Sequence, residues 1–68
     1  MVERDEHKRV LAAVQGLPRR QREVLVCRYY LELSEADTAR LLDISTGSVK
    51  KHAHRAVRAV QTQVEVTA

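Results

Sequence analysis

The sequence contains no phenylalanine or tryptophan, and its 68 residues include only two tyrosines, two glycines, one proline and one cysteine. Without large aromatic rings, a core must be built mainly from leucine, valine, alanine and isoleucine. The single cysteine, Cys27, excludes a disulfide within the chain and suits a reducing cytoplasm. No apolar run could cross a bilayer, and the charged N-terminus lacks a signal-peptide segment. We expect one small cytoplasmic domain, or a piece of a larger cytoplasmic protein, with no membrane partner.

Residue patterns typical of catalysis and metal binding are also missing. No carboxylate pair, glycine-rich phosphate loop or Ser/His/Asp arrangement is visible. His52 and His54 are two residues apart on a predicted helix and point to different sides, so they cannot chelate one metal ion. Cys27 lies alone in an apolar stretch and is expected to be a small core residue. We therefore expect no enzymatic activity, no cofactor and no small-molecule substrate.

Apolar spacing and helix-end signals predict an all-α, four-helix domain over residues 1–68. The predicted helices span residues 3–16, 19–32, 34–42 and 45–60. Gly16 and Pro18 separate the first two, because proline cannot continue a helix but is well placed in a first turn. The last two form a helix-turn-helix at about residues 34–60, with a long C-terminal recognition helix.

Several local signals support the helix-turn-helix. Ser34 and Ser45 precede the third and fourth helices and are good N-caps, because a serine oxygen accepts an otherwise unpaired amide. Small Ala39 allows the two helices to cross closely. Asp43 stands where such turns commonly carry glycine, so we expect it in the left-handed conformation.

The fourth helix is basic on one side. Residues 44–68 contain four Lys/Arg and one acid, whereas residues 1–43 contain eight of each, so the net charge of +3 comes entirely from the last third. The basic side consists of Lys50, Lys51, His54, Arg55 and Arg58. A solvated helix face is the simplest alternative. No acid of this helix interrupts the basic side, which favours a nucleic-acid partner.

The opposite side of the fourth helix and parts of the others should form the core. The expected core residues are Leu11, Val14, Leu17, Val24, Leu25, Ala39, Leu42, Val49, Ala53 and Val57. The second helix is more apolar than one buried face requires. It is either a central helix or partly a partner surface, and for the latter the expected contacts are Val26, Tyr30, Leu31 and Leu33.

Four stretches together resemble region 4 of bacterial sigma factors, most closely the extracytoplasmic-function type. They are LPRRQREVL at 17–25, RYY at 28–30, LSEADTA at 33–39 and GSVK at 47–50, within a similarity that covers about residues 10–60. Two positions depart from the family pattern: Thr38 replaces a usually apolar residue, and Asp43 replaces the usual glycine. Nothing resembles the sigma region that melts the minus-10 element.

The resemblance implies binding to the minus-35 promoter element through the major groove, and to the flap of the RNA polymerase β subunit through an apolar groove. An anti-sigma factor is a further expected partner. Lys50, Lys51, His54 and Arg55 occupy positions that face the major groove. The remaining expected DNA contacts, mainly to the backbone, are Thr46, Gly47, Ser48, Arg58, Arg19 and Arg20, with Arg22 beside the last two.

Two alternatives remain at the sequence level. The DNA-binding domain of two-component and quorum-sensing activators has a similar second helix, but usually dimerises through its last helix. A protein-interaction module would use the apolar second helix as its main surface and would not depend on Lys50 and Lys51.

Overall fold

Helices make up most of the chain, and the described residues contain no strand, which confirms the predicted all-α fold class. The computed structural model describes the backbone of residues 2–67 and the side chains of residues 6–64. The helices are α1 (Val2–Gln15), α2 (Arg19–Leu25), α3 (Glu35–Leu42) and α4 (Thr46–Thr67), and a π-helical segment, η1 (Val26–Tyr30), continues α2. Within the described residues, no helix has the length and apolar character needed to cross a bilayer.

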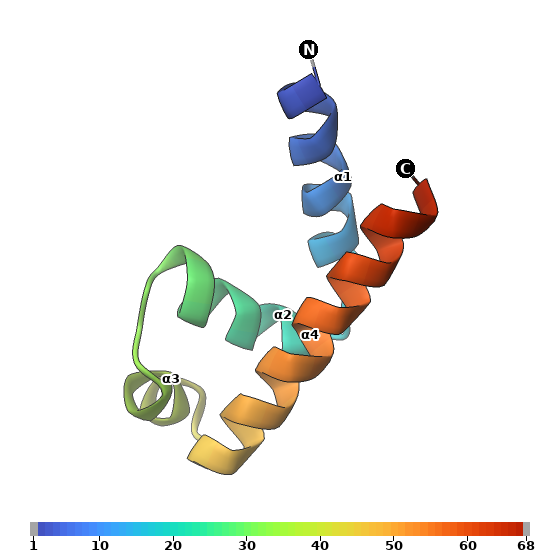
Figure 1. Ribbon diagram of the computed structural model, residues 1–68. Coiled ribbons are helices and arrows are strands. Elements are labelled where there is room, and N and C mark those ends of the chain that lie inside the picture. Colours follow the sequence, from blue (N-terminus) through green and yellow to red (C-terminus); the bar gives the residue numbers. More distant parts are fainter. Residues whose placement is uncertain (1, 68) are drawn as a thin grey trace.

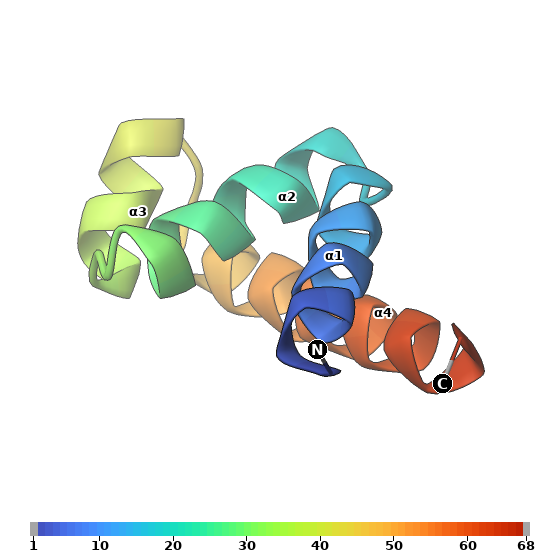
Figure 2. The same ribbon diagram turned by 90° about the horizontal axis from the view of Figure 1, so that it is seen from above.

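Helix α4 runs along the molecule, which measures 38 × 19 × 14 Å (Figure 1). Helix α3 packs against its first part and α1 against its second part, while α2 crosses it between them (Figures 1 and 2). Helix α3 with the first part of α4 therefore forms one end of the molecule, and α1 with the second part of α4 forms the other (Figure 1).

The second helix ends earlier than predicted. A continuous helix to about Glu32 was expected, but the α-helical pattern stops at Leu25 and the chain continues as η1. The amide of Leu31 donates to the carbonyl of Val26, five residues back, at 2.9 Å. Glu32 then adopts a left-handed conformation with φ of 56°, which ends the helix. The Arg28 guanidinium donates to the Leu33 carbonyl and so holds the following loop.

The helix-turn-helix has the predicted caps and turn. The Ser34 hydroxyl accepts the amide of Asp37 at 3.0 Å, and the Ser45 hydroxyl accepts the amide of Ser48 at 3.0 Å. Asp43 has φ of 57° and ψ of 49°, which confirms the left-handed conformation. The amide of Ile44 donates back to the carbonyl of Ala39 at 3.0 Å and closes the end of α3.

A cluster of buried apolar residues joins α2 to the helix-turn-helix. Val24, Ala39 and Val49 are buried together, with Leu42, Ile44 and Ala53 packed against them. Burial of Leu17 and Cys27 is also confirmed, whereas Val14, Leu25 and Val57 are only half-buried. Ala13, Thr38 and Ala56 are buried as well, although the expected core did not include them.

Leu11 was wrongly placed in the core, since 43% of it is exposed. Its spacing along α1 is that of a buried face. However, α1 packs mainly against α4, so the space between α1 and the segment α2–η1 stays open. The helical pattern identified an apolar side of α1 but could not show that only part of that side is covered.

Candidate functional site

The basic side chains predicted on α4 form one exposed surface. Lys50, Lys51, His54, Arg55 and Arg58 are all exposed, and we call this set the basic face. Val49 and Ala56, on the opposite side of the same helix, are fully buried. This division holds the helix in one rotational setting, because turning α4 would bury charge and expose the core.

The first turn of α4 is open to a ligand. Thr46 and Gly47 are exposed and Ser48 is half-buried. The Ser45 hydroxyl accepts the Ser48 amide and also donates to the Ser48 hydroxyl at 3.0 Å. A Cβ added at Gly47 would meet only the Ser45 hydroxyl, at 3.9 Å, so the backbone there can be approached closely. First-turn amides without helical partners attract anions such as phosphate.

The arginines at the start of α2 separate into two groups. Arg19 and Arg20 both pair with Glu23, at 3.2 and 3.1 Å, and Arg20 also donates to the carbonyl of Leu42 at 3.4 Å. Arg20 is therefore anchored beside the turn that leads into α4. Arg22 instead donates to the Gln15 carbonyl at 3.2 Å, where it stabilises the C-terminus of α1.

An acidic side chain that the sequence did not indicate lies beside the basic face. The carboxylate of Glu35, in the first turn of α3, lies 4.0 Å from the Lys50 ammonium of α4. The sequence of α4 contains no acid among its basic residues, but the fold supplies one from the neighbouring helix. Only knowledge of how α3 crosses α4 could have placed it there.

The cysteine and histidine side chains, which could bind a metal or take part in a reaction, do not come together in one site. Cys27 is buried, His54 is exposed, and His52 is half-buried with its Nδ1 atom unpartnered. Among the described residues, no group of three or more His, Cys, Asp or Glu side chains is placed to hold a metal ion.

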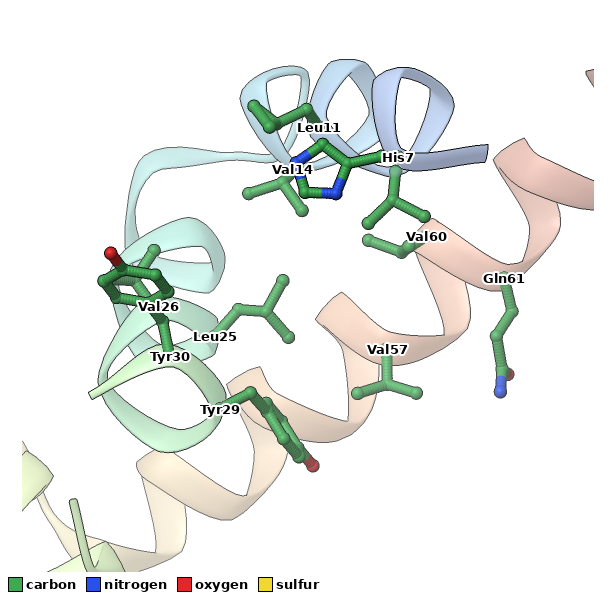
Figure 3. A pocket seen from close by; sticks show the side chains of 11 residues that line it. His7, Leu11, Val14, Leu25, Val26, Tyr29, Tyr30, Val57, Val60 and Gln61 are labelled. Atoms are coloured by element: carbon green, nitrogen blue, oxygen red, sulfur yellow. The ribbon is translucent and has the colours of Figure 1, made fainter. Parts of the chain in front are cut away.

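A second surface is an apolar groove of about 650 Å³ between α1, α2–η1 and α4 (Figure 3). Leu11 and Val14 come from α1, Leu25 from α2, and Val57 and Val60 from α4, as labelled in Figure 3. The other lining residues are His7, Val10, Val26, Tyr29, Tyr30 and Gln61. Because these walls are almost wholly apolar, the groove suits an apolar helix face of a partner rather than nucleic acid.

The predicted partner residues lie partly in this groove. Val26 and Tyr30 line it, and 81% of Tyr30 is exposed. Leu31 is exposed but does not line the groove, and Leu33 is half-buried in the loop that Arg28 holds. The sequence argument missed the walls from α1 and α4, because it considered the surplus apolar character of the second helix alone. The adjacent apolar pair Val10 and Leu11 was the available signal.

Comparisons with known proteins agree with this architecture. The family model for sigma-70, region 4, matches residues 7–60. Proteins named ECF RNA polymerase sigma factor SigD, from Mycobacterium tuberculosis strains H37Rv and CDC 1551 and from Mycobacterium bovis, are 32% identical over 63 residues. The match covers 93% of this chain and 30% of each relative, so the chain spans about a third of their length.

The matched family is a DNA-binding regulatory domain and not a known enzyme family. The match favours the sigma-factor resemblance over the activator alternative, because it includes α2 and the whole helix-turn-helix. The chain belongs to the sigma-70 region 4 family, of the extracytoplasmic-function type.

Proposed function

We propose that this domain recognises the minus-35 promoter element with its basic face and holds RNA polymerase through its apolar groove, and so directs transcription initiation in the bacterial cytoplasm. The observation that carries the proposal is the separation of the two surfaces. Four residues of the basic face, Lys50, Lys51, His54 and Arg55, lie in the first half of α4, and Arg58 lies further along the helix. The groove reaches α4 at Val57, Val60 and Gln61, and none of the residues of the basic face lines it. The domain can therefore bind both partners at once.

In the proposed DNA complex, the first half of α4 enters the major groove. Lys50, Lys51, His54 and Arg55 face the base edges, since they lie within the first three turns of α4. The amide end of α4, at Thr46, Gly47 and Ser48, meets a backbone phosphate. Arg58, Arg19 and Arg20 bind further phosphates and fix the position of the domain on the duplex.

Two features of the structure support this assignment. The capped start of α4 and the hydrogen bond from Arg20 to the Leu42 carbonyl place a cation and a helix N-terminus beside the same turn. The space over Gly47 is open, so the DNA backbone can approach the peptide chain. Both features suit a phosphate better than a protein surface.

The proposed polymerase contact is an apolar segment of the β-subunit flap seated in the groove. Val26 and Tyr30 are contacts within the groove, and Leu31 and Leu33 belong to the adjoining loop. An anti-sigma factor would act by covering the same groove. The free domain has a small DNA-binding surface, so attachment to polymerase is needed to raise the effective concentration at the promoter.

Salt-dependent duplex binding tests the proposed function. The wild-type chain selects a preferred duplex from a random-sequence pool, and a shuffled duplex of the same base composition is the control. Each phosphate contact contributes about −0.9 to the slope of log affinity against log salt. We expect a steep slope on both duplexes and tighter binding to the selected one. Affinity that does not change between low and physiological salt would contradict the proposal.

A further inference from the structure

The ion pair between Glu35 and Lys50 joins two helices. The other ion pairs between described side chains, from Arg19 and Arg20 to Glu23 and from Arg40 to Asp37, each lie within one helix. Glu35 comes from α3 and Lys50 from α4, and their side chains are 40% and 67% exposed. The pair therefore lies at the surface, where a bound duplex can reach both groups.

An exposed ion pair contributes little to stability, but the position of this pair bears on how the domain would bind DNA. Lys50 is one of the residues assigned to the base edges, and Glu35 is the first residue of α3. A duplex that meets Lys50 also meets the Glu35 carboxylate, which repels phosphate and neutralises part of the lysine charge. Cytosine N4 is a donor in the major groove, so the carboxylate is tolerated better beside bases than beside phosphates.

We propose that Glu35 is a specificity-determining positioning residue that keeps Lys50 from pairing with phosphates. This inference rests on the proposed function. An ammonium group has three donors, so Lys50 can contact Glu35 and a base acceptor at the same time. A phosphate bound to Lys50 in that arrangement would lie beside the Glu35 carboxylate, and the two negative charges would repel each other, whereas a neutral base acceptor would not be repelled. Glu35 therefore weakens sequence-independent binding more than it weakens binding to the preferred sequence.

Glu35→Gln removes the charge while keeping the size of the side chain. One additional phosphate contact of about 0.9 released counterion corresponds to roughly 0.7 log units at about 0.15 M salt. We expect the shuffled duplex to bind about fivefold more tightly, with a salt slope steeper by about 0.9. Affinity for the selected duplex should rise less, so the ratio of selected to shuffled affinity falls.

Asp37→Asn is the matched control. Asp37 lies in the same first turn of α3, but its carboxylate pairs with Arg40 of the same helix and not with α4. This change removes the same charge near the same helix end, so it reports any general electrostatic or helix-stability effect. We expect the salt slope and the affinity ratio to stay close to those of the wild-type chain.

The same Glu35 substitution in a chain that lacks the Lys50 ammonium tests whether Glu35 acts through Lys50. In the Lys50→Gln chain, the effect of Glu35→Gln should shrink to the size seen for Asp37→Asn. An unchanged affinity ratio in Glu35→Gln, or an equal effect with and without Lys50, would overturn the inference while leaving the proposed function intact. Salt-independent binding by the wild-type chain would overturn both, and circular dichroism of each variant confirms that it is folded.

Discussion

Among single residues, Arg55 and Arg58 are expected to differ in kind although both are exposed on α4. Arg55 lies one turn beyond Lys51, and in the proposed complex it reaches base edges, where its planar fork matches the guanine O6 and N7 acceptors. Arg58 lies further along the helix, and in the proposed complex it meets phosphates.

Replacing each arginine by alanine separates these roles. Arg55→Ala should weaken binding to the selected duplex by about 1–3 kcal/mol and flatten the preference at one or two base pairs. Arg58→Ala should weaken binding to the selected and shuffled duplexes alike and lower the salt slope by roughly one. The measurement that distinguishes the two roles is the ratio of selected-duplex affinity to shuffled-duplex affinity for each variant. If Arg58→Ala lowers this ratio strongly and Arg55→Ala leaves it unchanged, α4 docks on the duplex differently from the proposed complex.

The buried hydroxyl of Thr38 is expected to lower the stability of the domain. It is fully buried in α3, and its hydroxyl oxygen has no hydrogen-bond partner. A buried polar group without a partner destabilises a protein by about 1–3 kcal/mol, and valine has nearly the same shape without the hydroxyl. Thr38→Val should raise the free energy of unfolding by about 1 kcal/mol or more in urea denaturation.

The control for that change is Thr62→Val, at an exposed site of α4. It makes the same chemical substitution without removing a buried hydroxyl, so its effect should stay within about 0.5 kcal/mol. Equal effects at the two sites would show that the Thr38 hydroxyl is satisfied in solution.

Among the elements, the helix-turn-helix depends on the packing of Val49 between α3 and α4. Val49 is fully buried against Val24 and Ala39. Val49→Asp would bury a charge without a partner, and should lower the free energy of unfolding by more than about 4 kcal/mol. A domain of this size has little stability in reserve, so we expect loss of helical circular dichroism at room temperature.

Val10→Asp provides the comparison, because 42% of Val10 is exposed on α1. This variant should keep its helicity and melt cooperatively. Full helicity and a cooperative melt in Val49→Asp as well would refute the core assignment.

The apolar groove predicts a second set of variants. Leu11→Glu and Tyr30→Glu place a carboxylate in the groove, and both positions are exposed enough to leave the fold intact. Each should weaken binding to the purified flap domain of the β subunit at least about tenfold, because the charge would be buried in an apolar contact. Fluorescence anisotropy with labelled flap domain measures the change.

Leu41→Glu is the control for the groove, since 63% of Leu41 is exposed on α3 and it does not line the groove. It should leave flap binding unchanged, as should Lys50→Gln on the basic face. Undiminished flap binding by folded Leu11→Glu and Tyr30→Glu would rule out the groove as the polymerase contact.

These elements also show what the sequence could predict. The caps at Ser34 and Ser45 and the left-handed turn at Asp43 were predicted because each depends on a few neighbouring residues. The π-helical end of the second helix and the open groove at Leu11 were not. The π-helical end and the groove both depend on how α1, η1 and α4 pack against one another. The spacing of apolar residues along one helix does not contain that information.

The candidate site was predictable to a similar degree. The exposure of the basic face follows from the position of the apolar stripe on the same helix. The carboxylate of Glu35 beside Lys50 and the anchoring of Arg20 at the Leu42 carbonyl follow from helix crossings instead. Residues close in sequence could be assigned to one surface, whereas contacts between helices required the fold.

At the scale of the whole molecule, we propose that one end of α4 binds duplex DNA while the groove remains free for a protein. In Figure 1 the start of α4 lies beside α3, and α1 lies along the second part of α4. The groove touches α4 at Val57, Val60 and Gln61, in that second part. The two proposed functions would therefore use different parts of one continuous helix, and DNA binding should leave the groove unaffected.

Nuclear magnetic resonance tests this claim most directly. The ¹⁵N-labelled 68-residue chain is titrated with the selected duplex at low salt, and the shifts of the backbone amides are mapped. We predict the largest changes at residues 45–55 and at Arg20, changes that disappear as salt is raised, and little change at Leu11, Tyr29 or Val60. Shifts concentrated at the groove, with residues 45–55 unaffected, would contradict the account.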